Sequence, residues 1–223
     1  MKRSVFLMAA LSIALPFAWA QTEHPVSGRR IAGVMGVGGA DWLDRTERES
    51  EELPETALDK IGLKPGMTVA DVGAGSGYFT LRLSKRVGPT GKVAAVEIQP
   101  EMMAILRRRI SQEKLQNVEA YLSSETDPRL PKNSMDLILM VDVYHEFSQP
   151  QVMLRKMKEA LKPTGRLVLL EYRKEDPHIP IRVEHKMSVR EAEMELGAEG
   201  FKLEKVLKDL PRQHILIFRK DVM

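Results

Sequence analysis

The sequence predicts an α/β fold, in which a mostly parallel sheet has helices on both faces. From residue 55 onward, short apolar segments alternate with helix-like ones, the pattern of repeated strand-helix units. The segment Met135–Val141 is apolar almost throughout, as expected for a strand that is covered on both faces. A glycine-rich turn joins the first predicted strand to the helix after it, a junction typical of nucleotide-binding α/β domains.

Glycine and proline residues mark the element boundaries. The predicted strands are residues 68–72, 92–98, 118–122, 135–141, 166–171, 201–210 and 213–219. The predicted helices are residues 57–61, 76–87, 100–114, 151–161 and 188–197. Ser188, followed three residues later by Glu191, predicts a capping box at the start of the last helix.

Residues 69–77 form the most informative motif. An apolar run containing Asp71 is followed at once by Gly73, Gly75 and Gly77. A strand, a tight loop and a helix start can place backbone amides against a nucleotide-like ligand. Asp71 is a poor neighbour for a pyrophosphate but suits a positively charged ligand, such as the sulfonium S-adenosylmethionine (SAM).

Glu97 strengthens this prediction. It ends the second predicted strand, about 26 residues after Asp71, close to the expected position of a carboxylate that binds ribose hydroxyls. A dinucleotide site is a disfavoured alternative, because it requires Gly-x-Gly-x-x-Gly and Tyr78 stands at the third glycine position. A kinase-type phosphate loop is excluded because no Gly-Lys-Ser/Thr is present.

From Pro54 to Lys220 the sequence resembles the class I SAM-dependent methyltransferases. The resemblance is carried by residues 69–77, 93–98, 135–141 and 161–167. It implies a Rossmann-like sheet of seven strands with a final antiparallel strand, and Pro211 fits a hairpin there. It also implies that SAM is the cofactor and that a methyl group is transferred to an acceptor, which we expect to be a small molecule.

The resemblance assigns roles to individual residues. Asp71 would help to hold the methionine end of SAM, and the three motif glycines would let the backbone approach it. Glu97 would bind the ribose, Ile98 would lie against the adenine, and Asp142 would lie beside the methionine moiety and the methyl group.

One position departs from the family pattern. Where the family often has an aspartate that contacts the adenine amine, this chain has Thr126, flanked by Glu125 and Asp127. We expect Asp127 or a backbone group to make that contact.

His145 is the first candidate for a catalytic base, with Tyr144 and Glu146 beside it, because the end of the fourth strand should face the methyl group. A base is needed only if the acceptor must lose a proton. The alternative is that His145 only caps a helix or forms a hydrogen bond with the backbone.

No metal site is predicted. A site built from Asp142, His145 and His185 is disfavoured because the sequence lacks a tight ligand spacing.

Three segments are predicted: a leader (residues 1–20), an N-terminal extension (residues 21–54) and the methyltransferase domain (residues 55–223). Residues 21–30 are polar and predicted to be loose, and residues 42–52 predict a short charged helix that either closes over the cofactor or forms a solvated cap. We expect the acceptor to be bound by Trp42 and its helix, by Tyr144 and His145, and by residues 178–187.

The leader has Lys2 and Arg3 before an apolar run and a small-x-small site at Ala18-Trp19-Ala20. This is the pattern of a cleaved signal peptide and predicts an exported, periplasmic protein with no later membrane span; an uncleaved membrane anchor is the alternative. Export would take the enzyme away from cytosolic SAM, and the sequence leaves this conflict open.

With a formal net charge of +3 and no cysteine, we expect neither nucleic-acid binding nor disulfides. A non-catalytic SAM-binding protein of the same fold is the alternative to an enzyme.

Overall fold

The computed structural model describes residues 22–221, so the predicted leader lies outside the described residues. The strands are β1 (Thr68–Val72), β2 (Lys92–Glu97), β3 (Val118–Leu122), β4 (Met135–Val141), β5 (Leu161–Tyr172), β6 (Phe201–Leu207) and β7 (Gln213–Lys220). The α-helices are α1 (Ala40–Leu43), α2 (Arg48–Glu52), α3 (Pro54–Lys60), α4 (Tyr78–Val87), α5 (Pro100–Gln112), α6 (Pro150–Ala160) and α7 (Val189–Ala198). The 3₁₀ turns are η1 (Val37–Gly39), η2 (Tyr144–Glu146) and η3 (Val183–His185).

The seven strands form one sheet in the order β3-β2-β1-β4-β5-β7-β6. Strands β1 to β5 are parallel, and β7 runs antiparallel to both β5 and β6. The predicted final hairpin and antiparallel strand are therefore confirmed. The order reverses direction between β1 and β4, which is where doubly wound sheets open a ligand crevice beyond the carboxyl ends of their strands.

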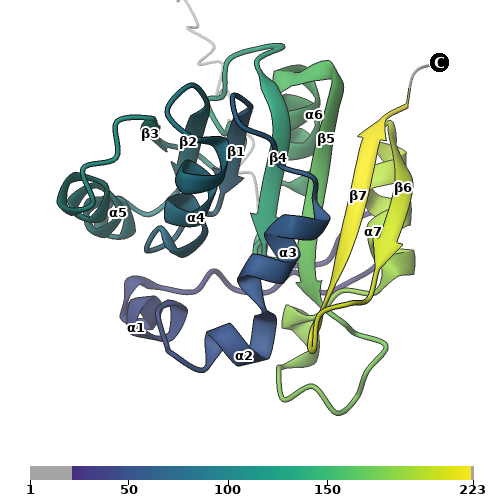
Figure 1. Ribbon diagram of the computed structural model, residues 1–223. Helices are drawn as coiled ribbons and strands as arrows, with labels where there is room; N and C mark the ends of the chain where they lie inside the picture. The colour runs from purple at the N-terminus through teal and green to yellow at the C-terminus, as the bar shows by residue number, and fades with distance from the viewer. Residues whose placement is uncertain (1–21, 222–223) are drawn as a thin grey trace, which may run out of the picture.

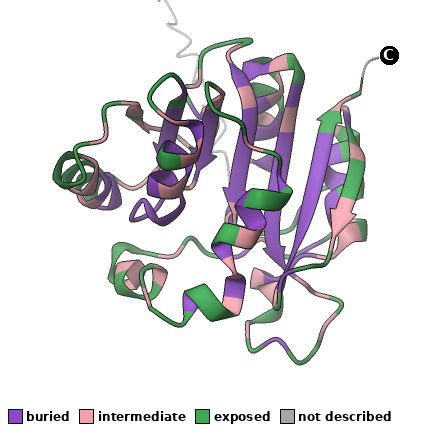
Figure 2. Ribbon diagram, viewed as in Figure 1, coloured by how far each residue is buried: buried purple, intermediate pink, exposed green. Residues whose placement is uncertain are grey.

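Helices cover both faces of the sheet (Figure 1). Alternate residues of β4 divide between two cores: Leu137 and Leu139 pack with α3 and α4, whereas Ile138 and Met140 pack with α6 and α7. Helix α5 packs against β2 and β3. Figure 2 shows the central strands buried along most of their length, which explains why residues 135–141 are apolar almost throughout.

The N-terminal extension lies across the end of the sheet where the parallel strands finish, with α1 and α2 below them in Figure 1. The prediction that this segment is loose is wrong for residues 22–30, the part that the structure describes. Arg29 is buried and its Nε and Nη2 donate to the two carboxylate oxygens of Glu195 on α7, at 3.0 and 3.1 Å. A bidentate pair of this kind is short and directional, and it fastens the extension to the domain.

Most predicted boundaries agree with the structure, and two differences have clear causes. Helix α4 begins at Tyr78 and not at Ser76, because Gly77 precedes it with φ of 90° and ψ of 17°, outside the helical region. The single charged helix predicted over residues 42–52 is two helices, α1 and α2, separated by residues 44–47. The capping box of Ser188 and Glu191 is confirmed. Among residues 22–221, no helix combines the length and the apolar character needed to cross a membrane.

Candidate cofactor-binding and active site

A cavity lies at the crevice between β1 and β4, with about 1050 Å³ of space including its mouth. Four strand ends contribute to the wall, through Gly73 and Gly75 after β1, Glu97 and Ile98 at β2, Ser123 and Ser124 after β3, and Asp142 and Val143 after β4. The structure brings five of the predicted residues together at this cavity, Gly73, Gly75, Glu97, Ile98 and Asp142, and their roles in binding stay predictions.

Glu97 is buried and organises one side of the cavity. Its Oε1 accepts hydrogen bonds from the amides of Ile98 and Gln99 at 2.8 and 2.9 Å, and its Oε2 accepts one from Gly75 at 2.9 Å. An ionised carboxylate offers about four acceptor sites, so Oε2 keeps capacity for one further donor. A ribose hydroxyl is a donor of this kind.

The glycine loop lies close to the strand end and the cavity wall beside it. The amides of Gly73 and Ala74 both donate to the carbonyl of Val96 at 2.9 Å, and that of Gly75 donates to Glu97. The expectation that loop amides point at the ligand is therefore wrong for these three residues. Gly73 has φ of +77°, and a Cβ there would stand 2.4 Å from Cγ2 of Val143, so a side chain would collide with the cavity wall.

Gly77 and Asp71 lie behind this wall and do not line the cavity. A Cβ on Gly77 would stand 2.8 Å from Leu106 Cδ1, so this glycine serves helix packing. Asp71 is buried, and its Oδ2 accepts a hydrogen bond of 2.6 Å from the Thr80 hydroxyl. Burial raises the pKa of Asp71 to about 6, with the Thr80 hydrogen bond and the charge of Arg48 opposing the rise.

Asp142 ends β4 in a left-handed conformation with φ of +49°, which aspartate tolerates better than most residues. Its Oδ2 accepts a 2.6 Å hydrogen bond from Gln213 Nε2 on β7, while its buried Oδ1 has no partner among the described residues. Burial, together with the charges of Glu52 and Glu171, raises the pKa of Asp142 well above its usual range. Asp142 itself lines the cavity, and a buried oxygen without a partner favours a nearby cationic or hydrogen-bond-donating group.

The expectation for the end of β3 needs correction. Thr126 is exposed, and Asp127 turns its Oδ1 toward the amide of Arg129 at 2.7 Å. Neither residue lines the cavity, which is bounded here by Ser123, Ser124 and Glu125. An aspartate readily bonds to the backbone two residues on, and this local turn carries Asp127 away from the cavity.

The N-terminal extension borders the cavity, which favours the alternative in which it closes over the cofactor. Val34, Met35, Trp42 and Leu43 all line it. Gln99 Nε2 donates to the carbonyl of Met35 at 2.9 Å, linking the extension to α5. Trp42 and its helix were expected at the acceptor site, whereas Val34 and Met35 were not predicted because their segment has no periodic pattern.

Residues after β4 are arranged differently from the prediction. In the 3₁₀ turn η2, side chains three residues apart share one side, so Val143 and Glu146 line the cavity and Tyr144 and His145 do not. Tyr144 is fully buried in the core, 5.7 Å from the ring of Phe147. The expectation that Tyr144 and His145 face the cavity is therefore wrong. Burial raises the pKa of Glu146, the residue that does face it, to about 7.

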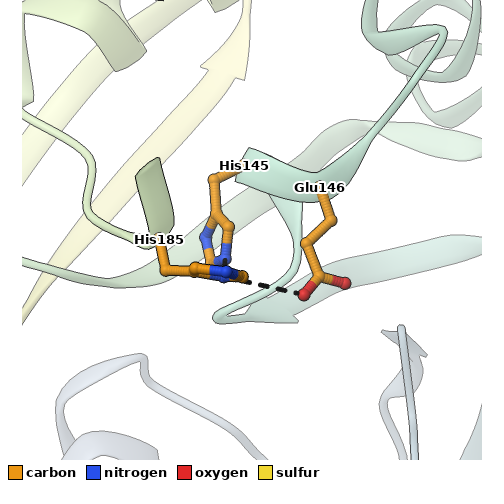
Figure 3. A group of neighbouring side chains, drawn as sticks. All are labelled: His145, Glu146 and His185. Atoms are coloured by element: carbon orange, nitrogen blue, oxygen red, sulfur yellow. Dashed lines mark hydrogen bonds and ion pairs between the residues drawn. The ribbon is translucent and has the colours of Figure 1, made fainter. Parts of the chain in front are cut away.

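His145 instead belongs to a buried polar row. Its Nδ1 lies 2.6 Å from Glu171 Oε2, and its Nε2 lies 3.2 Å from His185 Nδ1. Glu146 Oε1 is 3.9 Å from the same His185 nitrogen. Figure 3 shows the side chains of His145, Glu146 and His185 close together; the first two come from η2 and His185 comes from η3. The long segment between β5 and α7 brings His185 here, across 40 residues of sequence from His145.

Comparisons with known proteins agree with this geometry. Residues 63–209, well over half of the chain, match the family described as Methyltransferase domain. The chain belongs to this family. The crystal structure of a SAM-dependent methyltransferase from Aquifex aeolicus is 32% identical, covers 83% of this chain and 98% of its own, and superposes with a TM-score of 0.79. This methyltransferase domain therefore uses SAM, and the dinucleotide alternative is not supported.

Curated relatives are similar over a shorter stretch. The ubiquinone/menaquinone biosynthesis C-methyltransferase UbiE of Hahella chejuensis is 30% identical over 118 residues, which are 52% of this chain and 47% of the relative. The corresponding protein of Escherichia fergusonii is 32% identical over 118 residues, again 52% of this chain and 47% of the relative. The chain thus spans about half the length of the curated relatives it matches.

Proposed function

We propose that this protein transfers the methyl group of SAM to a small, largely apolar acceptor bound between the strand ends and the N-terminal extension. The observation that supports this is the apolar lining of the cavity. Trp42 and Leu43 of α1 line it, and so do Phe147 and Met153. An enclosed apolar wall favours a compact acceptor over a polymer. The small formal net charge of +3 points the same way.

The residues around the cavity fit SAM. Glu97 keeps acceptor capacity for a ribose hydroxyl, and Gly73 lets Val143 stand at the cavity wall where a Cβ would collide with it. Asp142 presents an unpartnered oxygen, and Ile98 offers an apolar side chain at the cavity wall. We assign these four residues to cofactor binding. Asp71 and Gly77 support them from behind, by holding Thr80 and by letting α5 pack closely.

When bound, SAM supplies an electrophilic methyl group on its sulfonium. The protein's contribution to such a transfer is mainly alignment of the acceptor and exclusion of water. Glu146 is the ionisable group of the turn η2 that lines the cavity, and His145 and His185 lie beside it. We propose that this row activates the acceptor, with Glu146 in contact and His145 acting through its neighbours.

The UbiE relatives are named as C-methyltransferases of quinone biosynthesis, so phenols and quinols are the first acceptors to test. Purified full-length protein should convert SAM to S-adenosylhomocysteine in the presence of one such ring and yield a product carrying one added methyl group. Glu146→Gln should lower the rate while SAM still binds. SAM binding without turnover across phenols, quinols, amines and carboxylic acids would instead support the non-catalytic SAM-binding alternative.

We further propose that the protein is exported, as its leader-like residues 1–20 suggest. Cell fractionation with N-terminal sequencing of the purified protein tests this. A mature chain that starts at Gln21 in the periplasmic fraction is expected, and an intact N-terminus in the cytosolic fraction would contradict it.

A further inference from the structure

We propose that His145, Glu146 and His185 form a binding site for a divalent transition-metal cation, with Zn²⁺ as the best match. One ligand atom from each residue lies within 4.8 Å of the other two. The two histidines come from different 3₁₀ turns, η2 and η3, and their rings meet nearly at right angles, at 83°. Figure 3 shows that all three side chains point toward one common space.

The spacing is close to that of a zinc site. Zinc binds histidine nitrogen at about 2.0–2.1 Å in tetrahedral sites, so two ligand atoms on one zinc stand about 3.4 Å apart. His145 Nε2 and His185 Nδ1 are 3.2 Å apart, and Glu146 Oε1 is 3.9 Å from the same His185 atom. A small movement of the Glu146 side chain would bring all three atoms within coordination distance of one cation.

Glu171 orients the cluster in the way that metal sites require. It is fully buried, and its Oε2 lies 2.6 Å from Nδ1 of His145, so that nitrogen carries a proton and donates it. The lone pair of His145 Nε2 is then directed at His185. The amide of Tyr144 donates to the other oxygen, Oε1, at 3.1 Å and fixes the carboxylate. A histidine whose second nitrogen donates to a carboxylate is the usual arrangement behind a metal-bound imidazole.

The hydrogen bond between the two rings can be replaced by a cation without a net change of protons on the two imidazoles. With His145 protonated on Nδ1, His185 Nδ1 donates its proton across the 3.2 Å contact. On binding a cation, His185 carries that proton on Nε2 and directs the Nδ1 lone pair at the metal. Two imidazoles and one carboxylate favour zinc, iron or cobalt and disfavour Mg²⁺, which prefers oxygen ligands.

Three protein ligands leave a coordination position open, as in catalytic zinc sites. Because Glu146 also lines the cofactor cavity, that position lies beside the space assigned to the acceptor. An oxygen atom of the acceptor can occupy it, and the cation would then lower the pKa of a bound hydroxyl. This last step rests on the proposed function and favours phenols and enols as acceptors; the binding of the cation does not depend on it.

The test uses full-length protein without a histidine tag, stripped of metal by a chelator. Calorimetric titration with ZnCl₂ is compared for the native chain, His185→Ala, Glu171→Gln and His178→Ala, with SAM binding measured on each. His178 is an exposed histidine seven residues before His185 and serves as the matched control. We expect zinc to bind at a single site that Mg²⁺ does not occupy. Glu171→Gln should weaken zinc binding about 10–100-fold, as losses behind a metal ligand do, and His185→Ala should weaken it more.

Native-like zinc affinity in His185→Ala, or no zinc binding by a native chain that binds SAM, would overturn the proposal. Zinc binding with the expected pattern in a chain that does not bind SAM would uphold the metal site and count against the cofactor assignment alone. The open position is tested with the Co²⁺-loaded native chain, whose visible absorption should change when acetohydroxamate is added. An unchanged spectrum would show that the coordination is closed.

Discussion

The amide of Gly75 and the carboxylate of Glu97 are joined by a 2.9 Å hydrogen bond between the glycine loop and the end of β2. The same carboxylate accepts from the two amides that begin the next connection, those of Ile98 and Gln99. Glu97 therefore shapes the cavity and also faces it. This dual role means that its loss should affect the cofactor site before it affects the rest of the fold.

Gly73→Ala should damage the cavity wall. The new Cβ would stand 2.4 Å from Val143 Cγ2, at a φ of +77°. Gly62→Ala is the matched control, because φ there is +68° but the nearest atom, Arg166 Nη1, is 3.6 Å away. Both variants carry backbone strain, and Gly73→Ala should lose roughly 1–3 kcal/mol more, the usual cost of overpacking. Denaturant unfolding measures this, and equal losses would mean that the loop yields freely.

Asp71 should make stability depend on pH. Its folded pKa of about 6 exceeds its ordinary value of 3.8, so between these values the folded chain holds a proton that the unfolded chain has lost. Stability from this group is fully present below the unfolded pKa and is lost as pH rises through the folded pKa.

Asp71→Asn removes this titration and keeps an oxygen that can accept from Thr80. Its unfolding free energy, relative to the native chain, should rise between about pH 4 and pH 7 by on the order of 3 kcal/mol. Unfolding curves at a series of pH values give the difference. A difference that stays flat, or falls with pH, would show that Asp71 is not held in this state.

Trp42→Ala should shorten the time that SAM stays bound. Trp42 lines the cavity, and the Arg45 guanidinium lies 3.7 Å from the centre of its ring. Val37→Ala is a suitable control, because Val37 is 40% exposed and Trp42 38%, yet Val37 does not line the cavity. Stopped-flow measurement should show dissociation about tenfold faster in Trp42→Ala, which corresponds to roughly 1.4 kcal/mol. Equal rates in the two variants would argue that the extension is only a solvated cap.

The sheet could be predicted closely because its signals are local. Strands β1, β3 and β4 have the predicted limits, since each is an apolar run bounded by polar or turn residues. Strand β5 was predicted to start at Arg166 but begins at Leu161, where Met135 and Leu161 pair before a register shift. Such pairing depends on a distant strand, so no local pattern reveals it.

Some residues of the site could likewise be predicted from local sequence signals, and others could not. Glu97 and Asp142 follow from strand ends and were placed correctly, because strand ends of a parallel sheet must meet at one edge. The direction in which the His145 side chain points was not predictable from the sequence. In the turn η2, a shift of one residue changes which side chain enters the cavity. The meeting of His145 with His185 requires the path of the whole segment after β5, for which the sequence holds no periodic signal.

The most direct test of the central claim is calorimetric titration of SAM into the full-length protein, with Glu97→Ala and the exposed Glu113→Ala in parallel. We predict binding by the native chain and by Glu113→Ala, and affinity about 10–100-fold weaker in Glu97→Ala, as expected for loss of hydrogen bonds to a charged group worth roughly 1.5–3 kcal/mol. Equal affinity in all three would contradict the assignment of Glu97 to the cofactor, and no binding by a folded native chain would contradict the site itself.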